Sequence, residues 1–191
     1  MKQICVFGSS SEQIARSYLE TAEELGKRLV QKGYGVIFGA GRYGIMGAVS
    51  RGVIAEGGSL LGISPDFFVD LKVLVEDYGE LILTHTMRER KALMEDKADA
   101  FVICAGGIGT LEEFFEVITL KQLGRHSKPI IILNTNSFYD PMIDMIEKSV
   151  EKSFMSSEVH KLYTVVDTLD EVFSELENYT AFSYNKYERK P

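Results

Sequence analysis

Residues 100–113 read Ala-Phe-Val-Ile-Cys-Ala-Gly-Gly-Ile-Gly-Thr-Leu-Glu-Glu, an apolar run that passes through three glycines into a helical pattern. The short, continuous run 100–104 is typical of a strand covered on both faces of a parallel sheet. Beyond it, apolar side chains recur with the spacing of one helix face, at Leu111, Phe114, Phe115 and Ile118. A strand that leads through glycines into a helix is the repeating unit of an α/β fold.

The same alternation runs through the rest of the chain. Helical patterns include Tyr18–Leu29 and Met142–Val150. Strands are expected at Gln3–Phe7, Tyr34–Phe38, Ser59–Ile63, Leu81–Thr84, Ala100–Cys104, Pro129–Leu133 and Thr164–Val166. This order predicts a Rossmann-like, doubly wound α/β fold with a mostly parallel sheet of about seven strands. We expect a single domain over residues 1–179 and a polar tail over residues 180–191.

Composition narrows the class of partner. The chain has 191 residues, 45% of them hydrophobic, and a net charge of −7, so it is globular and a poor general binder of nucleic acid. No apolar run approaches the roughly 20 residues that span a membrane. The apolar run that ends at Phe7 is too short for a secretory signal, so we expect a first strand there. Cys5 and Cys104 lie in apolar runs, which is typical of reduced core thiols and indicates a cytoplasmic protein.

The glycines after residue 105 predict an anion site. Gly106, Gly107 and Gly109 carry no side chain, so successive backbone amides can converge on a phosphate at the start of the helix that contains Thr110. No Gly-Lys-Ser/Thr follows, so the loop is not that of a nucleoside triphosphatase. Gly8 and Ser9, after the first strand, either contact the same anion or form only a turn with capping serines.

A second glycine-rich turn spans residues 39–47 and contains a G-x-G-x-x-G match. A dinucleotide site also needs an acidic residue about 20 positions later, and Leu61 stands there. A nicotinamide cofactor is therefore the weakest alternative, whereas close approach of a ligand at Gly41 remains open.

Residues 84–94 predict a helix on which basic side chains face the protein interior. Thr86 and Glu89 have the spacing of a capping box. Met87, Arg90, Lys91 and Met94 then share one face. Methionines on that face favour the core, so Arg90 or Lys91 either pairs with a carboxylate or a ligand phosphate, or extends to solvent.

Two acidic residues follow Thr110. Taken alone, Thr110 and Glu113 have the spacing of a second capping box, which favours a structural role for Glu113. Glu112 and Glu113 lie about 100° apart on a helix, so only one can face a substrate. The three histidines are scattered, which argues against a metal site.

The two segments together resemble the LOG family, the cytokinin riboside 5′-monophosphate phosphoribohydrolases, which long carried the label lysine decarboxylase. The family pattern Pro-Gly-Gly-x-Gly-Thr-x-x-Glu corresponds to residues 105–113, and Met-His-x-Arg-Lys corresponds to residues 87–91. Residues 39–47 resemble the family's third glycine motif, and residues 116–129 also match. The similarity extends over roughly the whole chain.

This resemblance implies a cytoplasmic homodimer of cytokinin biosynthesis, without cofactor or metal, that cleaves the N-glycosidic bond of a purine nucleoside 5′-monophosphate. Arg90 and Glu113 would be the catalytic pair. The residues expected to bind substrate or phosphate are Gly8, Ser9, Gly41, Met87, Lys91, Gly106, Gly107, Gly109, Thr110, Glu112 and Thr119.

The chain departs from the family pattern at a few positions. Ala105 replaces the proline, Arg88 the histidine and Ala40 a glycine. In the loop after the third strand, Lys72 stands where many members have a glutamate, with Asp70 nearby. We expect that loop to touch the base or the ribose.

Two further functions remain as alternatives. A nucleotide carrier or sensor would use the same phosphate loop without turnover. A pyridoxal phosphate enzyme, as the old label suggests, would need a lysine linked to the cofactor, and nothing distinguishes one of the candidates Lys91, Lys97 and Lys121.

Overall fold

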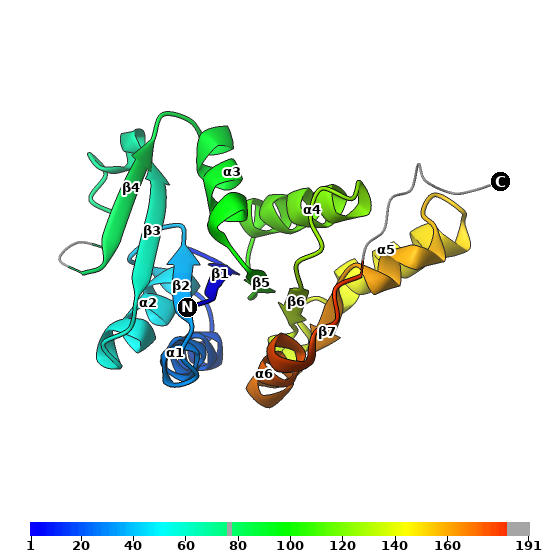
Figure 1. The fold of residues 1–191 in the computed structure, drawn as a ribbon, viewed down its shortest axis with the longest axis horizontal. Coiled ribbons are helices and arrows are strands. Elements are labelled where there is room, and N and C mark those ends of the chain that lie inside the picture. Colours follow the sequence, from blue (N-terminus) through cyan, green and yellow to red (C-terminus); the bar gives the residue numbers. More distant parts are fainter. Residues whose placement is uncertain (76–77, 183–191) are drawn as a thin grey trace.

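A computed structural model describes residues 1–75 and 78–182 (Figure 1). Most of the polar tail expected at residues 180–191 lies outside the described residues. The strands are β1 (Gln3–Phe7), β2 (Gly35–Phe38), β3 (Leu60–Pro65), β4 (Glu80–Thr84), β5 (Ala100–Ile103), β6 (Ile130–Leu133) and β7 (Thr164–Val166). The α-helices are α1 (Arg16–Gln31), α2 (Gly44–Ala55), α3 (Met87–Lys97), α4 (Ile108–Gln122), α5 (Asp140–Glu151) and α6 (Leu169–Asn178).

The seven strands form one parallel sheet in the order β4-β3-β2-β1-β5-β6-β7. This confirms the predicted doubly wound α/β fold. The predicted bounds of β1 and β7 match the observed ones, and those of the other strands differ by at most two residues at either end. The third strand, expected to end at Ile63, continues to Pro65 because Pro65 pairs with Thr84 of β4. A pairing between strands leaves no trace in the local apolar pattern that predicted the boundary.

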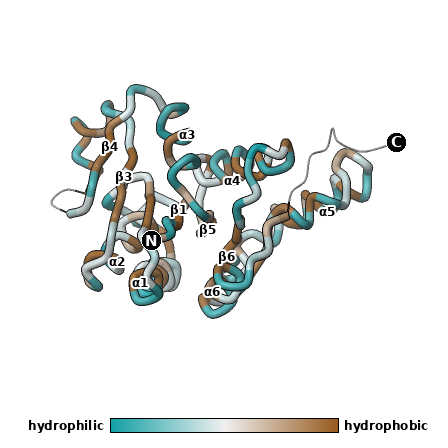
Figure 2. Tube along the Cα trace, viewed as in Figure 1, coloured by the Kyte–Doolittle hydropathy of each residue, from teal (hydrophilic) through white to brown (hydrophobic). Residues whose placement is uncertain are grey.

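Alternate residues of the central strands enter two separate cores. Ile4 and Val6 of β1 face a core shared with α1, α2 and α6, whereas Cys5 and Phe7 face a core shared with α3, α4 and α5. Figure 2 shows the central strands largely in the brown of hydrophobic residues. The continuous apolar runs in the sequence follow from this burial on both faces.

The strand order reverses between β1 and β5. The chain builds from β1 through β2 toward the β4 edge, then returns to the other side of β1 to form β5, β6 and β7. The loops that leave the carboxyl ends of β1 and β5 therefore run to opposite faces of the sheet, and a crevice opens between them. Ligands of open α/β sheets bind at such a reversal.

Helices α1 and α2 approach each other backbone to backbone. A Cβ atom on Gly26 would lie 2.3 Å from the carbonyl oxygen of Val49, and one on Gly52 would lie 2.0 Å from that of Glu23. These distances are shorter than real Cβ contacts. Because glycine is otherwise a poor residue in a helix interior, its presence here reflects packing rather than helix propensity.

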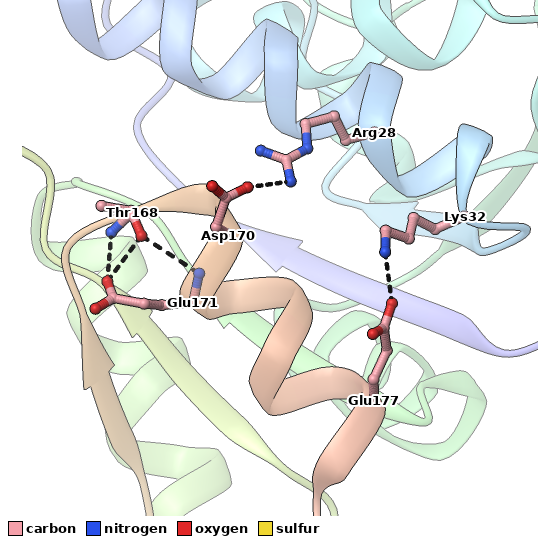
Figure 3. Close-up of polar contacts among 6 residues, drawn as sticks. All are labelled: Arg28, Lys32, Thr168, Asp170, Glu171 and Glu177. Carbon is pink, nitrogen blue, oxygen red and sulfur yellow. Dashed lines mark hydrogen bonds and ion pairs between the residues drawn. The ribbon is translucent and has the colours of Figure 1, made fainter.

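Charged side chains connect α1 with α6, the last helix among the described residues. Arg28 donates a hydrogen bond to Asp170 at 2.6 Å, and Lys32 donates one to Glu177 at 2.7 Å (Figure 3). The Arg28 guanidinium also lies 4.7 Å from the centre of the Phe173 ring. These pairs are partly or largely solvent-exposed, so each contributes at most about 1 kcal/mol to stability. The apolar contacts of α1 and α6 with the core contribute more to the stability of this region.

We expect Gly26→Ala to lower the free energy of unfolding by about 1–3 kcal/mol, because the added methyl group overpacks the contact with Val49. Helix propensity alone would give the opposite sign, a gain of about 1 kcal/mol. Urea unfolding followed by circular dichroism measures the change. Glu24→Ala, at an exposed position of the same helix, is the control and should change stability by less than about 0.5 kcal/mol. A stabilised Gly26→Ala variant would contradict the contact.

Candidate functional site

Three loops meet where the strand order reverses. The backbone N–H of Ser9, after β1, donates to the carbonyl oxygen of Ala105, after β5, at 3.1 Å. The carbonyl oxygen of Ser9 in turn accepts a hydrogen bond from Ile45 N–H, in the first turn of α2, at 2.8 Å. Backbone contacts thus fix the glycine-rich segments after β1, β2 and β5 against one another.

These loops surround a cavity of about 510 Å³. That volume lies in the range of small-molecule sites, roughly 300–1,000 Å³. Among the residues predicted from the sequence, those that line the cavity are Gly8, Ser9, Gly41, Met87, Arg90, Gly107, Gly109, Thr110 and Glu113. Segments as far apart in the sequence as those of Gly8 and Glu113 therefore converge on one site.

The start of α4 supplies the polar end of the cavity. Gly107 is the N-cap residue, and no side chain of the described residues caps the first turn of this helix. A Cβ atom added to Gly107 or Gly109 would meet no described atom within 4 Å, so the space in front of these residues is open. Free amides and the helix dipole together favour an anion at this point.

Gly106, also predicted to bind phosphate, lies behind the loop instead. A Cβ atom there would come within 2.1 Å of the Thr110 hydroxyl oxygen, and Gly106 is absent from the residues that line the cavity. Its lack of a side chain allows the turn to close against Thr110, which is itself buried.

A buried ion pair forms the wall next to these amides. Arg90 of α3 donates from Nη1 to Glu113 Oε1 of α4 at 2.8 Å, and from Nε to the carbonyl oxygen of Ile63 in β3 at 3.1 Å. The Arg90 and Glu113 side chains are only 8% and 9% exposed. A Cβ atom on Gly39 would lie 2.1 Å from Arg90 Nη2, so only glycine at position 39 leaves room for the guanidinium.

The environment of Glu113 alters its acidity. Burial raises the pKa of this carboxyl above its ordinary value of 4.5, and the charge and hydrogen bond of Arg90 act in the opposite direction. A carboxylate that is poorly solvated yet held by one fixed cation can stabilise positive charge that develops next to it.

Taken alone, residues 110–113 favoured a capping box between Thr110 and Glu113, and the structure shows that this interpretation is wrong. The helix begins at Ile108, two residues before Thr110, so Thr110 is not the N-cap residue, and the Glu113 carboxylate binds Arg90 instead. The other expected box is half formed. Thr86 accepts from Glu89 N–H, but the Glu89 side chain accepts from His85 N–H.

Lys91 turns away from the cavity. Its Nζ atom lies 2.8 Å from Glu112 Oε1 and 2.7 Å from Glu116 Oε2, and these contacts outweigh desolvation and raise the pKa of the lysine. Lys91 and Glu112 do not line the cavity. Thr119 is exposed and lines a different hollow of about 460 Å³, between α4 and the chain after α5. The structure therefore does not bring these three residues to the predicted site.

The loop after β3 supplies the apolar side of the cavity. Phe68, Leu71, Val73 and Leu74 line it, and the antiparallel bridge between Gly41 and Leu74 holds this segment against the glycine turn. Asp70 and Lys72, the positions that attracted attention in the sequence, are exposed and outside the lining.

Sequence reasoning missed several other lining residues. Gly39, Tyr43 and Met46 belong to the glycine turn, but only Gly41 was singled out there. Ile108 lies at the cavity rim with 87% of its surface exposed. An apolar residue between two glycines was the available signal for this last position.

The described residues contain no cluster of three or more histidine, cysteine or acidic side chains that could hold a metal ion. Within the same ranges, no helix combines the length and apolarity needed to cross a bilayer.

Comparison with known proteins gives relatives and structural neighbours. A family model described as "Possible lysine decarboxylase" matches residues 46–176. The cytokinin riboside 5′-monophosphate phosphoribohydrolase LOG of Oryza sativa subsp. japonica is 39% identical over 178 residues, which cover 93% of this chain and 74% of that protein. An Arabidopsis thaliana protein with the same enzyme name is 38% identical and covers 93% and 84%.

Solved structures extend the likeness in fold. The molybdenum cofactor binding protein of Rippkaea orientalis superposes with a TM-score of 0.71 at 19% identity, over 92% of this chain and 95% of that one. The molybdenum cofactor carrier protein of Chlamydomonas reinhardtii gives 0.70 at 20%, over 92% and 96%. Identities this low show the shared fold alone. The family match and the relatives above 35% identity decide the family, and they confirm the resemblance noted in the sequence: the chain belongs to the LOG family.

Proposed function

We propose that this protein hydrolyses the N-glycosidic bond of purine nucleoside 5′-monophosphates, AMP or its N6-substituted cytokinin forms, and releases the free base and ribose 5-phosphate. The observation that carries the proposal is the buried Arg90–Glu113 pair, which lines the same cavity as the open amides at the start of α4. The names of the relatives in Oryza sativa and Arabidopsis thaliana support an enzyme rather than a carrier.

The proposed mechanism begins with the phosphate. The amides of Gly107, Gly109 and Thr110 and the positive end of the α4 dipole bind it. Glu113 is one turn further along the same helix, so a nucleotide anchored at the amides presents its ribose to that carboxylate. Binding energy from the phosphate then positions the reacting carbon.

Cleavage of the glycosidic bond builds positive charge on the ribose ring, as in other oxocarbenium-like reactions. The Glu113 carboxylate stabilises this charge and orients a water molecule, which adds its hydroxyl group to the anomeric carbon while the base leaves with a proton. Arg90 holds Glu113 in place through a two-point contact with Glu113 and Ile63 and keeps the buried carboxylate ionised. The apolar segment Phe68–Leu74 faces the base.

We also propose that the protein is cytoplasmic and forms a homodimer. Cys5 and Cys104 are both buried free thiols, which fits a reducing cytoplasm. A homodimer is supported by the second hollow, whose rim carries Phe154 with 85% of its surface exposed. A second protomer seated there would cover apolar surface and enclose Thr119, the predicted substrate residue that lies outside the first cavity.

Glu113→Gln should lower kcat by about 100-fold or more, because the amide cannot balance positive charge on the ribose. Chromatography that follows free base from AMP and from N6-isopentenyl-AMP measures this, and it also ranks the two bases. The control is Glu116→Gln, on the same helix and likewise paired with a cation of α3 but outside the cavity, which should retain activity. AMP that raises the melting temperature of the wild type without any release of adenine would favour the carrier instead.

The pH dependence of kcat/KM, which reports groups of the free enzyme, should show an acidic limb with a midpoint above 4.5. Glu113 must be ionised, burial raises its pKa, and activity is therefore lost as pH falls through that raised value. Arg90→Gln should move the limb to higher pH, since the cation lowers the pKa of Glu113. Steady-state rates at AMP concentrations well below KM, between pH 4 and pH 9, test both statements. A wild-type midpoint at or below the ordinary glutamate value would contradict the assignment.

Light scattering after size exclusion should give twice the mass of one chain. Phe154→Asp should shift the mass toward that of the monomer, because a carboxylate would then be buried in the apolar hollow. Leu81→Asp, at another exposed apolar position on the outer strand β4, is the control and should leave the mass unchanged. A wild type that is monomeric at micromolar concentration would contradict the dimer.

A further inference from the structure

Tyr139 is a buried polar residue that the proposed mechanism does not use. It directly precedes α5, in the half of the sheet beyond β6, and is 2% exposed. It is also among the largest fully buried side chains of the described residues. Its hydroxyl donates a hydrogen bond to the carbonyl oxygen of Cys104 at 2.8 Å. A residue from one βα unit thus reaches under the loop of another.

The contact falls on the turn that leads into α4. Cys104 directly follows β5, and the backbone amide of Gly106 also interacts with the Tyr139 hydroxyl. On the opposite side of the turn, Ala105 accepts from Ser9 N–H. The three residues between the strand and the open amides are therefore held from both sides, by a loop on one side and by a single phenol on the other.

Tyr139 is itself rigidly placed. Its backbone N–H donates to Asn134 Oδ1 at 2.8 Å, and Asn134 Nδ2 donates to Asp140 Oδ1 at 2.8 Å. The ring packs edge-on against Phe138 with centroids 4.9 Å apart. A phenol fixed at both its backbone and its ring can transmit that rigidity to whatever its hydroxyl binds.

We propose that Tyr139 is a positioning residue, whose hydroxyl holds the Cys104–Gly106 turn so that the amides of Gly107 and Gly109 converge on the phosphate. The nature of the ligand rests on the proposed function, whereas the ordering of the turn does not. Tyr139 does not touch the cavity and acts only through the backbone. Burial raises the pKa of the Tyr139 phenol, and the charges of Cys104 and Glu113 act in the same direction.

Tyr139→Phe tests the proposal, because it removes one oxygen atom and keeps the ring. Hydrogen exchange of the backbone amides at residues 105–109 should become faster in the unliganded variant. The dissociation constants of AMP and of ribose 5-phosphate should rise by about five-fold, the equivalent of one net hydrogen bond. The dissociation constant of adenosine, which lacks the phosphate, should not change, and a general loss of stability would not produce this difference.

The matched control is Tyr179→Phe. The Tyr179 hydroxyl donates to the carbonyl oxygen of Ser127 at 2.9 Å, so it is also a phenol bound to a loop carbonyl. That loop precedes β6 and lies at the amino ends of the parallel strands, whereas the Cys104–Gly106 turn lies at their carboxyl ends. In Tyr179→Phe, the rate of hydrogen exchange at residues 105–109 and the affinity for AMP should equal those of the wild type.

Unchanged exchange at residues 105–109 in Tyr139→Phe would overturn the inference. Faster exchange with unchanged AMP affinity would also overturn it, since the turn would then not position the phosphate amides. A wild type that binds neither AMP nor ribose 5-phosphate would defeat the proposed function instead, and the exchange rates would still decide whether Tyr139 orders the turn.

Discussion

The buried ion pair between Arg90 and Glu113 constrains more of the site than any other described contact, because it joins α3, α4 and β3. Both side chains are nearly inaccessible, and a buried charge without a partner costs several kcal/mol. The pair is tolerated because Arg90 also binds the carbonyl oxygen of Ile63, so one guanidinium joins α3, α4 and β3. Glycine at position 39 is required by the same group, because any side chain there would occupy its space. The position of the Arg90 guanidinium therefore constrains four segments: α3, α4, β3 and the glycine turn that begins at Gly39.

The fold was largely predictable because the central strands of its sheet are buried on both faces. Runs such as Val102–Cys104 and Ile130–Leu133 are apolar at every position, and parallel sheets produce this pattern. The order of the strands, and hence the crevice between β1 and β5, depends on contacts between distant segments. The backbone contacts of Gly26 and Gly52 with the facing helix had no signal either, since the sequence shows only a glycine inside a helical pattern.

Capping patterns show where local reasoning fails. Thr110 and Glu113 have the right spacing, but the helix starts earlier and the carboxylate has a stronger partner in Arg90. The box that does form joins Thr168 and Glu171 at the start of α6, where the two side chains face solvent (Figure 3). At this exposed helix start Thr168 and Glu171 satisfy each other, whereas at the buried start of α4 the distant cation Arg90 binds the acid instead. Lys91 and Thr119 likewise could not be placed from motif spacing, because their orientation depends on the helix face and not on the motif.

Two kinds of segment line the cavity: helices packed on the core and the loop that follows β3. Arg90, Glu113 and the amides at the start of α4 belong to helices anchored in the core, whereas Phe68–Leu74 lies between strands and is fastened mainly by its bridge to the glycine turn. Substitutions in that segment can reshape one wall without disturbing the buried charges. Such separation lets a lineage change the molecules it accepts while keeping its chemistry, so that selectivity can drift faster in evolution than the reaction itself.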